Sequence, residues 1–125
     1  MTEIINTKDA PAAVGPYSQA VKKGNMIFVS GQIPFDPETM ELVSDDIKEQ
    51  TEQSLKNVKA ILAAAGATLD NVVKTRIYLD DMEQFCNVNE VYARFFNSKL
   101  PARVCMEVSR LPKDVKIEVE VTAIV

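Results

Sequence analysis

The stretch DIKEQTEQSLKNVKAILAAAGATLDNVVKTRIYLD, residues 46–80, joins a helical pattern to a strand pattern through a short connection. In its first part, apolar and small residues recur every three to four positions, which predicts a helix with one buried face. Asp46 and Glu49 are spaced as a capping box at its start, and Gly66 is placed to end it. In residues 71–80, β-branched residues predict a strand. That strand would carry four residues on one face: Val73, Thr75, Ile77 and Leu79.

Five further strands and one further helix are predicted on either side of this stretch. The helix covers residues 81–99, with Asp81 and Gln84 at its start. Its apolar stripe would consist of Phe85, Val88, Tyr92 and Phe95. The strands are predicted in residues 2–7, in two segments of 17–31 around a tight turn at 23–25, in 102–109 and in 115–125. Prolines and turn residues mark residues 9–16 and 32–45 as loops, the second with a short extended piece at 41–43.

The order of these elements, β-β-β-α-β-α-β-β, predicts an α+β fold in a single domain, residues 1–125. Two helices cannot cover both faces of a sheet of about six strands, so we expect both on one face. The segment MIFVS, residues 26–30, nevertheless carries apolar side chains on both faces of its strand. We therefore expect the uncovered face of the sheet to be buried by self-association.

The composition limits the classes of protein and of site. A net charge of −4 and a pI of about 4.8 argue against nucleic acid as the main partner, because phosphate binding depends on Lys and Arg. There is no histidine and no glycine-rich phosphate loop, so we expect no metal and no cofactor. Two cysteines without a CxxC motif suggest reduced thiols in the cytoplasm. We see no signal peptide, and no run approaches the roughly 18 apolar residues of a membrane span.

The segment PARVCME, residues 101–107, places reactive side chains in an otherwise apolar strand. In a strand, Arg103, Cys105 and Glu107 share one face. Arg103 then has three interpretations: a solvated edge residue, a structural ion-pair partner, or an anchor for an anionic ligand. Cys105 could be a nucleophile, but no histidine can serve as its base, and a lone cysteine is more often a small buried apolar residue.

The last predicted strand adds two acids to the candidate chemistry. Glu118 and Glu120 alternate with an apolar face, so they lie on a face that could also carry Arg103. On the functional interpretation, the arginine anchors a carboxylate and a glutamate positions water. On the structural interpretation, these residues form a cross-strand ion pair or a solvated edge. Spacing alone leaves both interpretations open.

Three further polar residues have an ordinary structural interpretation when each is taken alone. Tyr17 and Ser30 stand at strand ends, where polar groups can line the rim of a pocket. Asn89 lies within the second predicted helix, where a surface asparagine is the default.

Several blocks taken together resemble one family over about residues 3–125. They are APAAVGPYSQAV, NMIFVSGQIPFDP, QSLKNVKAILAAAG, VNEVYARFF and PARVCMEVSRLPKDVKIEVEVTAIV. In this order they are similar to the RidA (YjgF) family of reactive-intermediate deaminases. The resemblance implies a chorismate-mutase-like fold: a six-stranded, mostly antiparallel mixed sheet with two helices on one face. It also implies a homotrimer in which the open sheet faces form a central barrel, with active sites in clefts between subunits.

The resemblance further implies hydrolysis of 2-imino acids or their enamine tautomers, such as 2-iminobutanoate and 2-iminopropanoate, to 2-oxo acids and ammonia. These imines are released by pyridoxal-phosphate-dependent dehydratases acting on serine and threonine. Arg103 would bind the substrate carboxylate, and Glu118 matches the position that orients water. Five positions match pocket-lining positions of the family, the last through its main chain: Tyr17, Ser30, Gly31, Asn89 and Cys105. Two alternatives remain: a small-acid-binding or regulatory protein without turnover, and a ribonuclease or translation inhibitor.

Overall fold

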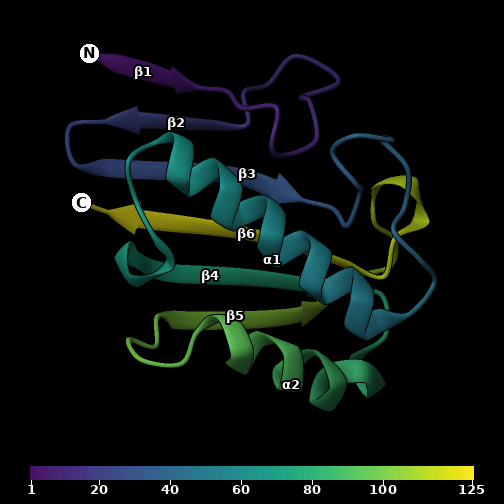
Figure 1. Ribbon diagram of the computed structural model, residues 1–125. Helices are drawn as coiled ribbons and strands as arrows, with labels where there is room; N and C mark the ends of the chain where they lie inside the picture. The colour runs from purple at the N-terminus through teal and green to yellow at the C-terminus, as the bar shows by residue number, and fades with distance from the viewer.

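The computed structural model describes residues 1–125 and contains one six-stranded mixed sheet (Figure 1). The strands are β1 (Thr2–Ile5), β2 (Ala20–Lys23), β3 (Met26–Gln32), β4 (Val72–Leu79), β5 (Ala102–Glu107) and β6 (Ile117–Ile124). Their order across the sheet is β1-β2-β3-β6-β4-β5, and only the pair of β4 and β5 is parallel. The predicted order of elements and the mostly antiparallel mixed sheet are confirmed.

Helices α1 (Ile47–Ala64) and α2 (Phe85–Phe95) lie on the same face of the sheet, as predicted (Figure 1). The alternate residues of β6 from Ile117 to Ala123 point to this face and are at most 1% exposed. They join the buried stripe of α1 in one hydrophobic core of 22 residues. Since β4 and β5 run parallel, the chain needs a crossover between them, and α2 is that crossover.

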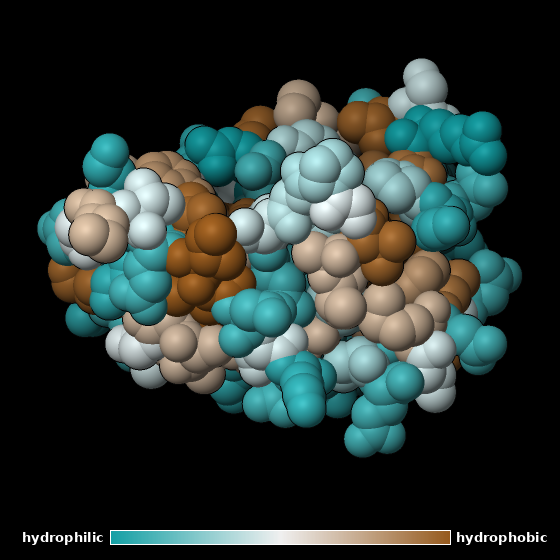
Figure 2. Space-filling model, turned by 90° about the horizontal axis from the view of Figure 1, so that it is seen from above, coloured by the Kyte–Doolittle hydropathy of each residue, from teal (hydrophilic) through white to brown (hydrophobic).

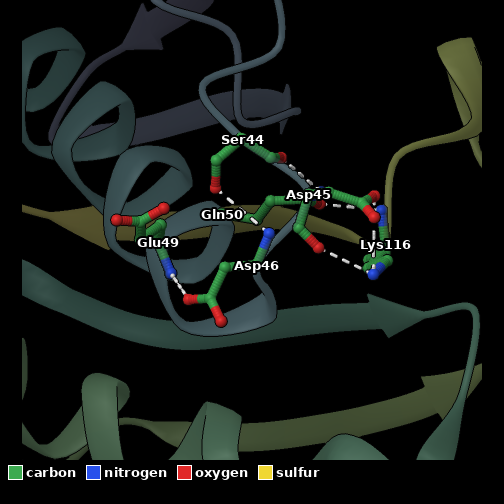
Figure 3. Close-up of polar contacts among 6 residues, drawn as sticks. All are labelled: Ser44, Asp45, Asp46, Glu49, Gln50 and Lys116. Carbon is green, nitrogen blue, oxygen red and sulfur yellow. Dashed lines mark hydrogen bonds and ion pairs between the residues drawn. The ribbon is translucent and has the colours of Figure 1, made fainter.

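The start of α1 is tied to the start of β6 by a small polar network (Figure 3). Asp46 accepts a hydrogen bond from the backbone N–H of Glu49 at 2.9 Å, as an N-cap should. The predicted capping box is only half formed, because Ser44 Oγ, and not Glu49, accepts from the backbone N–H of Asp46. Gln50 donates to the carbonyl of Ser44 and accepts from the backbone N–H of Lys116 at 2.9 Å. The network therefore fixes the chain two residues before Glu118.

The prediction that Val73 shares a face with Thr75, Ile77 and Leu79 is wrong. Val72 is 4% exposed and Val73 is 43% exposed. The register of β4 against β6 shifts by one residue between Val72 and Lys74, which is a β-bulge. The extra residue turns Val73 outward, while the buried positions further along the strand remain as predicted.

The second predicted helix is longer than the observed one. A three-residue 3₁₀ turn, Met82–Gln84, precedes α2, and Asp81 caps that turn by accepting from the backbone N–H of Glu83 at 3.0 Å. The helix ends at Phe95. Val91 and Phe96 are buried in addition to Val88 and Tyr92, whereas Phe85 and Phe95 are only half-buried.

The sheet face opposite the helices is uncovered in this chain. Phe28, Met106 and Ile124 are between 39% and 43% exposed, and Phe28 is paired with Thr122 on this face. Figure 2 views a different side, from above and toward β1, where apolar patches alternate with polar side chains. Neither helix combines the length and the apolar character that crossing a membrane requires.

Candidate functional site

A cleft of about 820 Å³ opens beside the ends of β3 and β6. Its lining includes three of the residues predicted for the site, Tyr17, Gly31 and Glu118. Ser30 is adjacent in sequence to Gly31 but lines a neighbouring hollow of about 280 Å³ with Glu120. We call Tyr17, Ser30, Gly31 and Glu118 the glutamate half-site.

A β-bulge in β3 shapes the glutamate half-site. Val29 pairs with Val121 and Gln32 pairs with Val119, so Ser30 and Gly31 together stand opposite one residue, Glu120. The hydroxyl of Ser30 donates to the carbonyl of Ser18 at 2.7 Å, which holds the bulge against the chain that follows Tyr17. Bulges are common next to active sites, where they redirect side chains.

Gly31 is required by the position of the Glu118 side chain. A Cβ atom built on Gly31 would lie 2.7 Å from Glu118 Cδ and even closer to its Oε2. Such a separation is too short for two carbon atoms that are not bonded to each other. The absence of a side chain at Gly31 therefore lets the carboxylate of Glu118 lie against the bulge.

The carboxylate of Glu118 is half-buried and accepts no hydrogen bond within the chain, unlike that of Glu120. Burial raises the pKa of Glu118, and the nearby negative charge of Glu120 raises this pKa further. Glu120 instead accepts a hydrogen bond from the hydroxyl of Tyr78 at 2.5 Å, and this bond, together with burial, raises the pKa of Tyr78 to about 12. Of the two acids, Glu118 is thus the one available to a ligand, and a raised pKa makes its carboxylate a stronger base.

Gln19 organises the loop that carries Tyr17, and sequence reasoning missed it. Its side chain is 2% exposed and donates to the carbonyls of Thr7, Ala10 and Pro11 at 3.1, 3.3 and 2.8 Å. It also accepts from the backbone N–H of Thr7 at 2.7 Å. The only signal in the sequence was that Gln19, a polar residue, stands near the start of a predicted strand. This signal does not show which backbone carbonyls its side chain would bind.

Two further walls of the cleft were not predicted as parts of a site. The segment predicted as a loop folds into a hairpin with a bridge between Phe35 and Leu42, and both residues line the cleft. Lys113, which lines the cleft beside Glu118, has a φ of 59°, in the left-handed region that residues with side chains seldom adopt. Strained backbone of this kind persists where the surrounding structure holds it, and it is often found at functional sites.

The remaining predicted residues lie together on β5 and α2, apart from the cleft. The guanidinium of Arg103 donates to Oδ1 of Asn89 at 2.7 Å. Its Cζ atom lies 4.9 Å from the ring centroid of Tyr92 and 5.4 Å from that of Phe85, within the range of cation–π interactions. We call Asn89, Arg103 and Cys105 the arginine half-site.

Arg103 is exposed and forms none of the four ion pairs of the chain. The interpretation of Arg103 as a structural ion-pair partner is therefore wrong within this chain. Cys105 is half-buried, and burial raises the pKa of its thiol although the charge of Arg103 partly offsets this effect. A raised pKa disfavours the thiolate, so the sulfur of Cys105 is poorly suited to nucleophilic attack.

The two half-sites lie on opposite faces of the sheet, which corrects the expectation of a shared face. In the parallel register of β4 and β5, Arg103 pairs with Thr75, which is 0% exposed and faces the helices. Glu118 pairs with Tyr78, which alternates with the helix-facing residues of β4 and so points to the uncovered face. Arg103 and Glu118 of one chain therefore cannot act on one small ligand.

The candidate site offers no evident metal ligands. Nowhere in the chain do three or more Cys, Asp and Glu side chains gather closely enough to hold a metal ion. The chemistry available to the two half-sites is that of a guanidinium, a glutamate of raised pKa and polar backbone groups.

Comparison with known proteins shows which family this arrangement belongs to. A family model described as Endoribonuclease L-PSP matches residues 7–125. The chain belongs to this family.

Individual relatives cover nearly the whole chain. A RutC family protein of Pyrococcus horikoshii is 58% identical over 123 residues, which are 98% of each chain. A 2-iminobutanoate/2-iminopropanoate deaminase of Escherichia coli is 52% identical over 127 residues, covering 99% of this chain and 98% of the relative. The crystal structure of Escherichia coli TdcF with bound serine has a TM-score of 0.94 and 45% identity, and covers 98% of each chain. The resemblance to the RidA (YjgF) family is thus confirmed.

Proposed function

We propose that the protein hydrolyses 2-imino acids, such as 2-iminobutanoate and 2-iminopropanoate, and their enamine tautomers, to 2-oxo acids and ammonia. The observation that carries this proposal is the guanidinium of Arg103, which is held in place but has no carboxylate partner. Arginine binds carboxylates in a bidentate manner through its planar fork. The relative named as a 2-iminobutanoate/2-iminopropanoate deaminase, at 52% identity, supports this choice of substrate.

The complete site, on this proposal, takes one half from each of two copies of the chain. The opposite orientation of Arg103 and Glu118 on the sheet supports a shared site, because one chain cannot bring them together. The exposed apolar residues of the uncovered face support association through that face. We infer a homotrimer with a central barrel, as in the RidA family, which works in the cytoplasm.

The mechanism that we propose needs one water molecule. Arg103 binds the substrate carboxylate, with Asn89 and the main chain at Cys105 beside it. Glu118 of another copy accepts a proton from water while the oxygen bonds to the iminium carbon, which gives a tetrahedral carbinolamine. Glu118 then gives this proton to the amino group. As the C–N bond breaks and ammonia leaves, Glu118 takes the proton of the carbinolamine hydroxyl, whose oxygen becomes the carbonyl of the 2-oxo acid. Ammonia takes up that proton as ammonium, which restores the Glu118 carboxylate. Tyr17, Ser30 and Gly31 line the water side of the site.

The test couples the protein to a threonine dehydratase and measures how fast 2-oxobutanoate appears. We expect the purified protein to accelerate the release of 2-oxobutanoate above the spontaneous rate. Arg103→Ala should abolish this acceleration, and Arg103→Lys, which keeps the charge but loses the fork, should restore little of it. Arg94→Ala is the matched control, since Arg94 is exposed on the same helix as Asn89 and should be dispensable. No acceleration by the wild-type protein, or full acceleration by Arg103→Ala, contradicts the proposal.

A second candidate function is binding of a small acid without turnover. The relative solved with bound serine, an amino acid with a carboxylate, favours this alternative as much as it favours catalysis. Calorimetric binding of 2-oxobutanoate that depends on Arg103, without any acceleration of imine hydrolysis, would establish it.

The family description also names an endoribonuclease. The net charge of −4 weighs against RNA as a substrate, because RNA binding depends on basic surface residues. RNA cleavage that disappears in Glu118→Gln would favour this alternative, whereas cleavage that persists in every variant would indicate a contaminating nuclease.

A further inference from the structure

Three residues of α2 form a cradle under the guanidinium of Arg103. Phe85, Asn89 and Tyr92 are spaced by four and three positions, so they share one face of the helix. Asn89 accepts a hydrogen bond from the guanidinium, while the rings of Phe85 and Tyr92 lie under it. Two of these three residues, Phe85 and Tyr92, have no part in the proposed mechanism.

Two contacts besides that with Arg103 hold Tyr92 in place. It is 7% exposed, and its hydroxyl lies 2.9 Å from Oγ1 of Thr75, which is 0% exposed. Its ring packs on that of Phe96, with centroids 4.6 Å apart. Burial raises the pKa of Tyr92, so its hydroxyl remains protonated and able to hydrogen-bond to Thr75 at neutral pH.

The hydrogen bond to Thr75 links the arginine to the sheet by a second route. Thr75 is also the residue that pairs with Arg103 between β4 and β5. The backbone of Arg103 is thus held by β4, and its guanidinium rests on a ring whose hydroxyl is anchored at the same point of β4. This closed arrangement fixes both ends of a long, exposed side chain that would otherwise be mobile.

We propose that Tyr92, anchored by Thr75, is a positioning residue that orders the guanidinium of Arg103 before any ligand binds. Asn89 sets the rotation of the guanidinium plane by accepting one N–H, which leaves the other N–H groups free for a carboxylate. The ring of Tyr92 sets the height of the guanidinium above the helix. The consequence for ligand affinity rests on the proposed function, whereas the ordering itself does not.

The test measures order in the free protein, so it needs no substrate. The probe is the NMR order parameter of the Arg103 Nε–Hε bond in nitrogen-15-labelled protein. We expect a rigid side chain in the wild type and a value below about 0.6, typical of flexible groups, in Tyr92→Leu. Tyr92→Phe keeps the ring but loses the hydrogen bond to Thr75, so it should give a value between those of the wild type and Tyr92→Leu. Val88→Ala is the matched control, because Val88 is buried on the same helix at 1% exposure and does not touch the guanidinium.

A second measurement links the order to function. Calorimetry with 2-oxobutanoate should show a dissociation constant about fivefold higher for Tyr92→Leu than for wild type, the loss expected for one cation–π contact. Val88→Ala should leave that constant unchanged. If Tyr92→Leu does not fold, Phe85→Leu, at a half-buried position, should lower the order parameter in the same direction.

The outcomes separate this inference from the proposed function. An Arg103 that stays equally ordered in Tyr92→Leu and Phe85→Leu, or that loosens equally in Val88→Ala, overturns the positioning role. If Arg103 loosens as expected but the wild type does not accelerate imine hydrolysis, the inference stands and the proposed function fails.

Discussion

The two half-sites differ in the kind of structure that builds them. The arginine half-site rests on regular elements, β5 and α2, whose spacing brings two rings and an amide under Arg103. The glutamate half-site rests on irregular backbone: a bulge at Ser30 and Gly31, a hairpin bridge, and a turn with positive φ at Lys113. A strand and a helix can support the long side chain of Arg103 at the surface. Irregular backbone instead leaves room for a cleft beside the shorter side chain of Glu118.

The charges of the half-sites differ in the same way. The positive charge of Arg103 is stabilised by π faces but has no counter-charge, while the negative charge of Glu118 is disfavoured by burial and by Glu120. Each half-site therefore lacks what the other provides. On the proposed function, this complementarity would let a substrate, with a carboxylate at one end and an attacking water at the other, fit between two copies.

The largest expected effect comes from Glu118→Gln, which removes the proposed base from the glutamate half-site and leaves the arginine half-site intact. We expect imine hydrolysis to fall by about 100-fold or more, as for loss of a general base. Binding of 2-oxobutanoate should change little, because Arg103 remains. Glu120→Gln is the matched control, since Glu120 already accepts the hydroxyl of Tyr78 and should be dispensable for the reaction. Equal losses in both variants would show that the two acids are not distinct.

A tenfold effect is expected from Gly31→Ala, which tests the close approach of Gly31 and Glu118. The new methyl group would displace the carboxylate of Glu118 and lower kcat by about tenfold, because small misplacements of catalytic groups are costly. The check is a double-mutant cycle on stability. Gly31→Ala should destabilise the wild type more than it destabilises Glu118→Ala, where no carboxylate remains to be displaced. Equal destabilisation in both backgrounds would mean that the two residues do not interact.

A smaller effect is expected from pH. Since burial raises the pKa of Glu118, its carboxylate protonates at a higher pH than an ordinary glutamate. Activity should therefore fall on acidification through this raised pKa, and the fall should disappear from the residual activity of Glu118→Gln. The free energy of unfolding should respond to pH in the opposite direction. Because the pKa is raised in the folded state, that state binds the proton more tightly than the unfolded state does. Glu118 therefore stabilises the fold less as pH rises through the raised pKa. Denaturant unfolding of wild type and Glu118→Gln across this window measures the difference.

The smallest effect on activity is expected from Ser54→Ala, because Ser54 belongs to neither half-site. The hydroxyl of Ser54 is fully buried in α1 and has no hydrogen-bond partner. Replacing it should raise the free energy of unfolding by about 1 kcal/mol, because a buried unpaired polar group is removed and alanine favours a helix. Urea unfolding should detect the gain, with unchanged imine hydrolysis. A loss of stability would mean that the hydroxyl has a partner, such as a buried water.

The sequence predicted the arginine half-site better than the glutamate half-site. Helical spacing placed Tyr92 on the buried stripe of its helix, and alternation placed Arg103 with Cys105 on one face. Alternation within single strands could not tell which faces of β5 and β6 coincide, because this depends on the pairing of each strand with β4. Nor could it reveal the bulges that expose Val73 and that set Gly31 against Glu118. A bulge is an extra residue between paired strands, and it has no signal in one strand alone.

The most direct measurement of a site shared between copies is complementation between two inactive variants. Arg103→Ala lacks only the arginine half-site, and Glu118→Gln lacks only the glutamate half-site. Unfolding equal amounts of both together and refolding them should restore imine hydrolysis to about a quarter of the wild-type rate, because random mixing pairs two intact halves in that share of sites. The same two proteins refolded separately and then combined serve as the control. Mixed assemblies that stay as inactive as each variant alone would show that no site is shared between copies.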